Sequence, residues 1–121
     1  MKNVFLIFIG GGAGSVLRFL ISKLLNNSWF DLPLGTFVVN VVGSFCIGII
    51  LGATLKTTTT NTSLIFLLAT GFCGGFTTFS TFAYENQYFL KNGDFSSFAI
   101  YTLGTITVAT AAVFIGVFLA K

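Results

Sequence analysis

Hydroxyl, glycine and phenylalanine residues are mixed in the segment GGFTTFSTF, Gly74 to Phe82, within a long apolar stretch. A glycine pair followed by two threonines weakens a helix, and an unwound turn exposes main-chain amides and carbonyl oxygens. Because lipid offers these groups no hydrogen bonds, such a turn persists only where it binds an ion or contacts protein. Carbonyl oxygens are ligands that suit an alkali cation. The segment therefore predicts a third helix broken mid-membrane.

Two phenylalanines that follow the pair Thr77-Thr78 have the spacing needed to act together. Phe79 and Phe82 are three residues apart and share a helix face. The edge of a phenyl ring carries partial positive charge, so ring edges in a pore can contact a small anion without a fixed cation. Ordinary packing is the alternative, because the chain contains 16 phenylalanines.

Further polar residues recur at helical spacing in the apolar stretches. Thr36 and Asn40 are four residues apart, and the Asn40 side chain has two N–H donors. Polar side chains in hydrocarbon are functional or face protein, so Asn40 either contacts an ion or joins helices. Ser97, Tyr101 and Thr105 form a second stripe of this kind, although a threonine can also bond to its own helix.

The charged residues of the apolar stretches lie near their ends. Arg18 and Lys23 both lie towards the end of the first stretch, where long side chains can extend to water. Glu85 lies near the far end of the third stretch, and we expect it to reach the interface or a wet vestibule.

The composition is that of a membrane protein. The chain has 121 residues, 55% hydrophobic and 7% charged, with a mean hydropathy of +0.96, whereas soluble domains carry about 25% charged residues. The net charge of +3 is small and scattered, which argues against a nucleic-acid partner. Histidine is absent, and Cys46 and Cys73 lie in apolar runs, so we expect buried thiols and no disulfide framework.

Four apolar stretches are each long enough for a helix that crosses a bilayer, which needs about 20 residues. Asp31 and Pro33 are suited to start the second helix, and Asn92-Gly93-Asp94 predicts a turn. The short connections between stretches make neighbouring helices antiparallel. The sequence predicts an all-α membrane protein with one four-helix domain over residues 1–121. The stretches are Val4–Leu25, Leu34–Leu55, Ser63–Phe89 and Ser97–Ala120.

Basic residues are balanced between the two membrane faces, three against three. Since this balance gives no preferred orientation, we expect the chain to insert both ways and to pair as an antiparallel homodimer. A single orientation set by other loop features is the alternative. The two sets are Lys2, Lys56 and Lys121 on one face, and Arg18, Lys23 and Lys91 towards the other.

Small residues recur every four positions in the first two helices. Gly10 and Gly14 form one such pair, and Ser44, Gly48 and Gly52 continue the pattern. Small residues let helix backbones approach closely. The pattern serves either contacts within the chain or dimerisation.

Three segments together resemble the CrcB/Fluc family of fluoride channels. The resemblance covers essentially the whole chain and implies an antiparallel, dual-topology homodimer in a bacterial cell membrane, with two fluoride pathways at the subunit interface. It implies passive fluoride efflux that reduces toxicity, and no enzymatic activity. The segments are GGGAGSVLRF (Gly10–Phe19), GTFVVNVVGSF (Gly35–Phe45) and GFCGGFTTFSTF (Gly71–Phe82).

The resemblance also implies roles for individual residues. A structural sodium ion on the two-fold axis is held by the main-chain carbonyls of Gly74 and Thr77. Arg18 is expected near the aqueous vestibule. The fluoride pathway is expected to include Asn40, Phe79, Phe82, Ser80, Thr81, Tyr101, Thr36, Thr105 and Glu85.

Two other functions are compatible with a short four-helix membrane chain. A small multidrug-type exporter is also a dual-topology dimer, but it is expected to carry a membrane-embedded glutamate in its first helix. Here the first helix has no acid, and Glu85 belongs to the third. A non-transporting assembly subunit is the second alternative, in which the glycines and phenylalanines only pack.

Overall fold

The computed structural model describes residues 1–26 and 32–121. The helix start predicted at Asp31 lies outside the described residues. The regular elements of the described residues are all helices, without strands. Its elements are α1 (Lys2–Leu25), α2 (Leu34–Ala53), α3 (Thr62–Ile65), η1 (Phe66–Cys73), α4 (Gly74–Phe76), α5 (Phe79–Lys91) and α6 (Phe95–Ala120).

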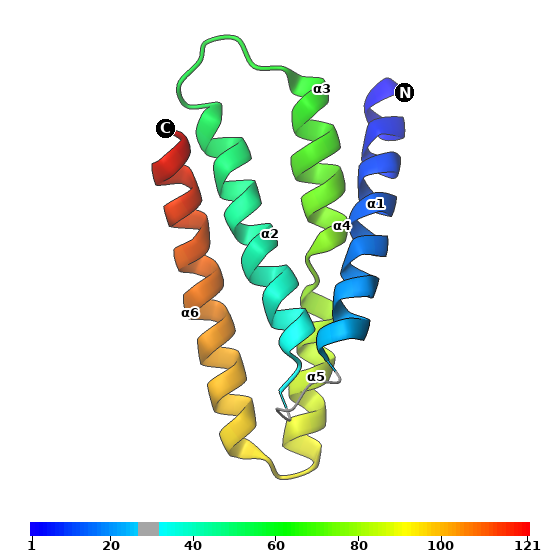
Figure 1. The fold of residues 1–121 in the computed structure, drawn as a ribbon, viewed down its shortest axis with the longest axis vertical. Coiled ribbons are helices and arrows are strands. Elements are labelled where there is room, and N and C mark those ends of the chain that lie inside the picture. The colour runs from blue at the N-terminus through cyan, green and yellow to red at the C-terminus, as the bar shows by residue number, and fades with distance from the viewer. Residues whose placement is uncertain (27–31) are drawn as a thin grey trace.

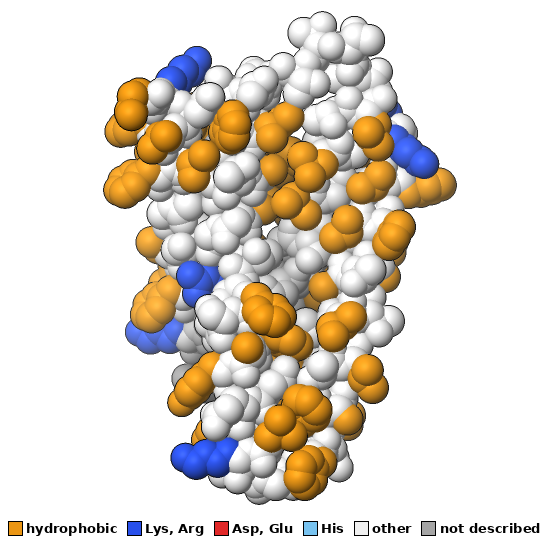
Figure 2. All heavy atoms as spheres, turned by 180° about the vertical axis from the view of Figure 1, so that it is seen from behind, with side chains coloured by type: hydrophobic (Ala, Val, Ile, Leu, Met, Phe, Trp, Pro, Cys, Tyr) orange, Lys and Arg blue, Asp and Glu red, His pale blue; other side chains and the backbone are white. Residues whose placement is uncertain are grey.

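These elements form four spans that are long and apolar enough to cross a membrane, which confirms the predicted multi-pass arrangement. Consecutive spans run in opposite directions, and both labelled termini lie at the end that carries the connection between α2 and α3 (Figure 1). The turn between α5 and α6 lies at the opposite end. Seen from behind, hydrophobic side chains are spread over the surface from one end of the molecule to the other (Figure 2). The spans are Lys2–Leu25, Leu34–Ala53, Thr62–Lys91 and Phe95–Ala120.

The third span is interrupted by two extended residues. Thr77 has φ −88° and ψ 159°, and Thr78 has φ −152° and ψ 118°. The ribbon narrows to a thread there, between α4 and α5 (Figure 1). The preceding part, η1, is wound as a π-helix. We call residues 74–78 the helix break.

The glycines of the predicted segment keep the helical conformation. Gly71 lies inside η1, and Gly74 and Gly75 lie inside α4. Among the described glycines, positive φ occurs at Gly93. The two threonines leave the helical conformation instead.

The glycines of the third span serve close packing against α1. A Cβ atom added at Gly75 would overlap the backbone of Gly11, and one added at Gly14 would overlap that of Phe72 and Phe76. The backbone of α1 is therefore in direct contact with the backbones of η1 and α4. Close approach of this kind replaces the hydrophobic drive that lipid does not supply.

A second glycine contact joins α2 to α6. A Cβ atom at Gly48 would meet the Val113 carbonyl oxygen at 2.5 Å, and one at Gly116 would meet the Phe45 carbonyl oxygen at 2.5 Å. These small residues of α1 and α2 therefore act in contacts within the chain.

Side chains at the helix ends determine where α2 and α6 begin. Asn26 follows α1, and its Oδ1 accepts hydrogen bonds from the N–H groups of Gly35, at 2.6 Å, and Thr36, at 3.3 Å. Pro33 is the residue before α2 rather than its first residue. The predicted turn is present, with φ 73° at Gly93, and Asp94 Oδ1 accepts from the N–H of Ser97 at 3.1 Å.

Candidate functional site at the helix break

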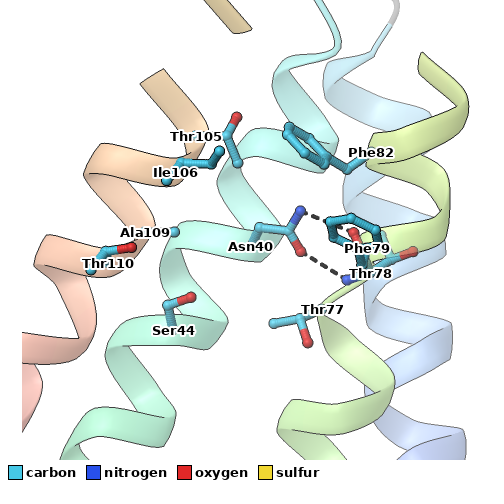
Figure 3. A pocket seen from close by; sticks show the side chains of 10 residues that line it. All are labelled: Asn40, Ser44, Thr77, Thr78, Phe79, Phe82, Thr105, Ile106, Ala109 and Thr110. Atoms are coloured by element: carbon cyan, nitrogen blue, oxygen red, sulfur yellow. Dashed lines mark hydrogen bonds between the residues drawn. The ribbon is translucent and has the colours of Figure 1, made fainter. Parts of the chain in front are cut away.

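A cavity of about 290 Å³ lies between α2, the helix break and α6 (Figure 3). Its polar lining consists of one amide and five hydroxyl side chains, and its lining residues carry no charge. Hydroxyl and amide groups can donate hydrogen bonds, so the cavity offers donors without a fixed ion. The lining residues are Asn40, Ser44, Thr77, Thr78, Phe79, Phe82, Thr105, Ile106, Ala109 and Thr110.

Asn40 bridges α2 to the break. The N–H of Thr78 donates to Asn40 Oδ1 at 2.8 Å, and Asn40 Nδ2 donates to the Thr78 carbonyl at 3.1 Å (Figure 3). The side-chain amide thus supplies both partners that the extended backbone loses. Because Nδ2 carries two hydrogens, one donor remains after this bridge. Asn40 joins helices and can still donate into the cavity that it lines.

Thr78 also begins the next helix. The N–H of Thr81 donates to Thr78 Oγ1 at 3.2 Å, while Ser80 Oγ lies 3.4 Å from the same oxygen. Within the described residues the N–H groups of Phe79 and Ser80 form no hydrogen bond. The first turn of α5 therefore has free donors at the positive end of a helix dipole.

The carbonyl groups of the break itself have unequal surroundings. Gly75 O accepts from Arg18 Nε at 2.9 Å and from Ser15 Oγ at 3.4 Å. Within residues 1–26 and 32–121, the carbonyl oxygens of Gly74 and Thr77 accept no hydrogen bond. Arg18, predicted near a vestibule, has its guanidinium directly on the break.

The phenylalanine pair is asymmetric. The ring centroids of Phe79 and Phe82 are 5.9 Å apart, with the planes tilted by 50°. Phe82 is 7% exposed, and its centroid lies 5.1 Å from that of Tyr101, whereas Phe79 is 78% exposed in the single chain. Packing holds Phe82 at the cavity, and the face of the molecule that carries Phe79 is uncovered.

Glu85 is hydrogen-bonded to two of the predicted pathway residues. Tyr101 Oη donates to Glu85 Oε1 at 2.7 Å, and Thr36 Oγ1 donates to Oε2 at 2.8 Å. Tyr101 and Thr36 are buried and Glu85 is half-buried. The three residues form a second polar cluster, one helical turn beyond Phe82 and outside the cavity.

The predicted pathway residues are thus divided among three places: the cavity, the cluster around Glu85 and the first turn of α5. Asn40, Phe79, Phe82 and Thr105 line the cavity, and the buried Thr105 hydroxyl has no hydrogen-bond partner among the residues that the structure describes. Ser80 and Thr81 belong to the first turn of α5 and do not line the cavity.

Ser44, Thr110 and Ser15 are polar residues at the site that were not predicted for it. Ser44 follows Asn40 by four residues, so their shared helix face is a signal that sequence spacing contains. Ser15 could be found only from the contact between α1 and the break.

The chain is similar in sequence to known proteins over nearly its whole length. The family described as CrcB-like protein, camphor resistance (CrcB), matches residues 5–117. A protein of Gloeothece citriformis is 45% identical over 122 residues, spanning 100% of this chain and 98% of the relative. A protein of Chlorobaculum tepidum is 44% identical over 121 residues, spanning 100% of this chain and 96% of the relative. Both relatives are named fluoride-specific ion channel FluC.

Proposed function

The chain belongs to the CrcB-like family, and we propose that it is a fluoride-specific channel giving passive fluoride efflux across the bacterial cell membrane. The observation that carries this proposal is the uncharged cavity at the break, lined by Asn40, Phe79, Phe82 and hydroxyl groups. Hydrogen fluoride enters cells as a neutral acid and dissociates inside. A passive path for the anion therefore limits fluoride accumulation and its toxicity.

Fluoride loses its water shell on entering such a path. Several groups of the lining can each replace part of the lost hydration. The remaining Asn40 N–H, nearby O–H groups and the phenyl edges each offer partial positive charge. The free N–H groups of Phe79 and Ser80 lie in the first turn of α5, where a helix favours anions. Several weak contacts let an ion leave again, whereas one deep electrostatic well would retain it.

The cluster around Glu85 is proposed as the next part of the path. The hydroxyls of Thr36 and Tyr101 donate to the Glu85 carboxyl group. An anion can use these two donors only when the carboxyl group releases them. Glu85 would therefore compete with fluoride at this end of the path.

An antiparallel homodimer is the proposed assembly. It is supported by the balance of basic residues between the two membrane faces and by the exposure of Phe79, which the single chain leaves uncovered. Reporter fusions at either terminus should detect both orientations of the native chain. One exclusive orientation would reject the dual topology and leave the cavity chemistry unchanged.

A structural sodium ion is proposed at the centre of this dimer. The carbonyl oxygens of Gly74 and Thr77 fit such an ion, because both are oxygen ligands without a hydrogen bond in the described chain. A two-fold axis would supply each carbonyl twice. When bound, sodium would add positive potential beside the path and satisfy main-chain groups that lipid cannot.

Purified protein in liposomes provides the test. A potential should drive fluoride efflux, followed with a fluoride electrode, while chloride efflux stays at the level of empty liposomes. Equal efflux of fluoride and chloride would reject a selective channel. The absence of any fluoride efflux would reject a fluoride channel altogether. Fluoride movement that required sodium to cross with it would reject the structural role of the metal.

A further inference from the structure

Arg18 and Ser15 hold one carbonyl of the helix break from a neighbouring helix. Arg18 Nε donates to Gly75 O at 2.9 Å, and Ser15 Oγ donates at 3.4 Å. The two residues are three apart on α1 and share a face. In an unbroken helix this carbonyl would accept from the N–H of Phe79, but the extended residues Thr77 and Thr78 prevent that bond.

This contact separates the Gly75 carbonyl from its neighbours. Successive residues of a helix are about 100° apart around the axis, so the carbonyls of Gly74 and Gly75, both directed along the axis, lie on different sides of the helix. Gly75 lies against α1, where an added Cβ would overlap Gly11, while Gly74 is exposed. The Gly74 carbonyl therefore lies on the side that this chain leaves uncovered.

The close approach of α1 brings these two donors to the break. A Cβ atom at Gly14 would overlap the backbone of Phe72 and come within 2.8 Å of the Phe76 nitrogen. With the backbones this close, the Ser15 and Arg18 side chains begin next to α4. A charge-assisted hydrogen bond there contributes more than a neutral one.

We infer that Arg18, assisted by Ser15, is a positioning residue for the proposed sodium site. It holds the Gly75 carbonyl on the α1 side and thereby keeps the carbonyls of Gly74 and Thr77 free for the metal. The inference rests on the proposed function for the metal itself. It assigns Arg18 a role at the break, through the backbone, in addition to any role of its charge near a vestibule.

A purely electrostatic role of Arg18 and a positioning role predict opposite effects on sodium affinity when the guanidinium is removed. A guanidinium repels a nearby cation, so a role through charge alone predicts that Arg18→Gln binds sodium more tightly. A positioning role predicts weaker binding, because the released Gly75 carbonyl lets the break rearrange. Loss of a charged hydrogen bond corresponds to about a tenfold change.

The test is a sodium titration of the purified full-length protein in detergent, with N-methylglucamine replacing sodium. The readout is the thermal unfolding midpoint, supported by the ²³Na NMR linewidth. We expect the half-saturating sodium concentration to rise about tenfold in Arg18→Gln and about threefold in Ser15→Ala. Arg18→Lys should lie between wild type and Arg18→Gln, since it retains the charge but not the planar donor.

Lys56→Gln is the matched control, because it removes a positive charge from the exposed α2–α3 connection and should leave the titration unchanged. Tighter or unaltered sodium binding in Arg18→Gln would overturn the inference while the metal proposal stands. If Arg18→Gln does not fold, the same criterion applies to Ser15→Ala and Arg18→Lys: weaker sodium binding supports the inference, and tighter or unaltered binding overturns it. A wild-type protein that shows no sodium dependence would reject the metal site and the inference together.

Discussion

The third and fourth spans line the same cavity in different ways. α6 is a continuous helix from Phe95 to Ala120, and it contributes the side chains of Thr105 and Thr110. The third span also contributes main-chain groups, because its helix stops at Thr77 and Thr78. Its polar groups therefore need partners from elsewhere, whereas the backbone of α6 satisfies itself.

Those partners come from two other helices. Asn40 of α2 bonds to Thr78, and Arg18 of α1 bonds to Gly75. An unpaired main-chain group in hydrocarbon costs several kcal/mol, by order of magnitude. The break is therefore maintained by its neighbours, and changes to these neighbours should have larger effects than changes to α6 hydroxyls.

The largest effect is expected for Asn40→Asp. The carboxylate removes the N–H donor to the Thr78 carbonyl and places a negative charge where the anion passes. Liposome fluoride efflux should fall about 100-fold or more, which corresponds to about 2.7 kcal/mol. The oligomeric state, measured by size exclusion, shows whether the loss lies in conduction or assembly. Efflux at the wild-type rate would remove Asn40 from the path.

Phe82→Ile should reduce fluoride efflux by about tenfold while the dimer stays intact, since an aliphatic side chain lacks the positive ring edge. Phe89→Ile is the matched control. Phe89 is buried at 6% exposure on the same helix but does not line the cavity, so its replacement should lower stability without changing efflux per folded dimer. Equal efflux losses in both variants would assign Phe82 to packing alone.

Gly14→Ala should lower the free energy of unfolding by about 1–3 kcal/mol. Its methyl group would overlap the Phe72 backbone and push α1 away from the third span. Gly12→Ala, on the same helix, meets nothing within 4 Å and should leave stability unchanged or slightly raised. Thermal unfolding in detergent measures both. Similar midpoints for the two variants would contradict the close contact between α1 and the break.

Thr105→Val should have the smallest effect. The Thr105 hydroxyl is buried and has no hydrogen-bond partner within the described part of the chain, so an equally shaped apolar side chain should leave the unfolding midpoint unchanged or raised. Fluoride efflux should fall no more than about threefold, because one donor among several is lost. A marked loss of stability would show that α6 depends on its polar groups as the third span does.

Local signals predicted the fold and the place of the break. Apolar length predicts a span at Leu34–Leu55, close to the observed helix Leu34–Ala53, because crossing a bilayer needs about 20 residues, whatever the neighbours are. The turn with positive φ at Gly93 is likewise a property of a few adjacent residues. The break lies in the segment of glycines and threonines where the sequence predicted it, and within that segment Thr77 and Thr78 leave the helical conformation.

Pairings between helices could not be predicted in this way. The bond of Arg18 to Gly75 joins residues 57 positions apart, and that of Asn40 to Thr78 joins residues 38 positions apart. Such pairs depend on how two helices are shifted and rotated relative to each other. Spacing within one helix contains no information on that register.

The amino-acid sequence alone determined that this is a four-span membrane protein with hydroxyls, an amide and phenylalanines at membrane depth, because hydropathy and helical spacing are local properties. The tertiary structure decided which main-chain groups of the third span are satisfied and which stay free. That outcome depends on the approach of α1 and α2, whose glycines allow backbones to touch and whose Arg18 and Asn40 then reach the break.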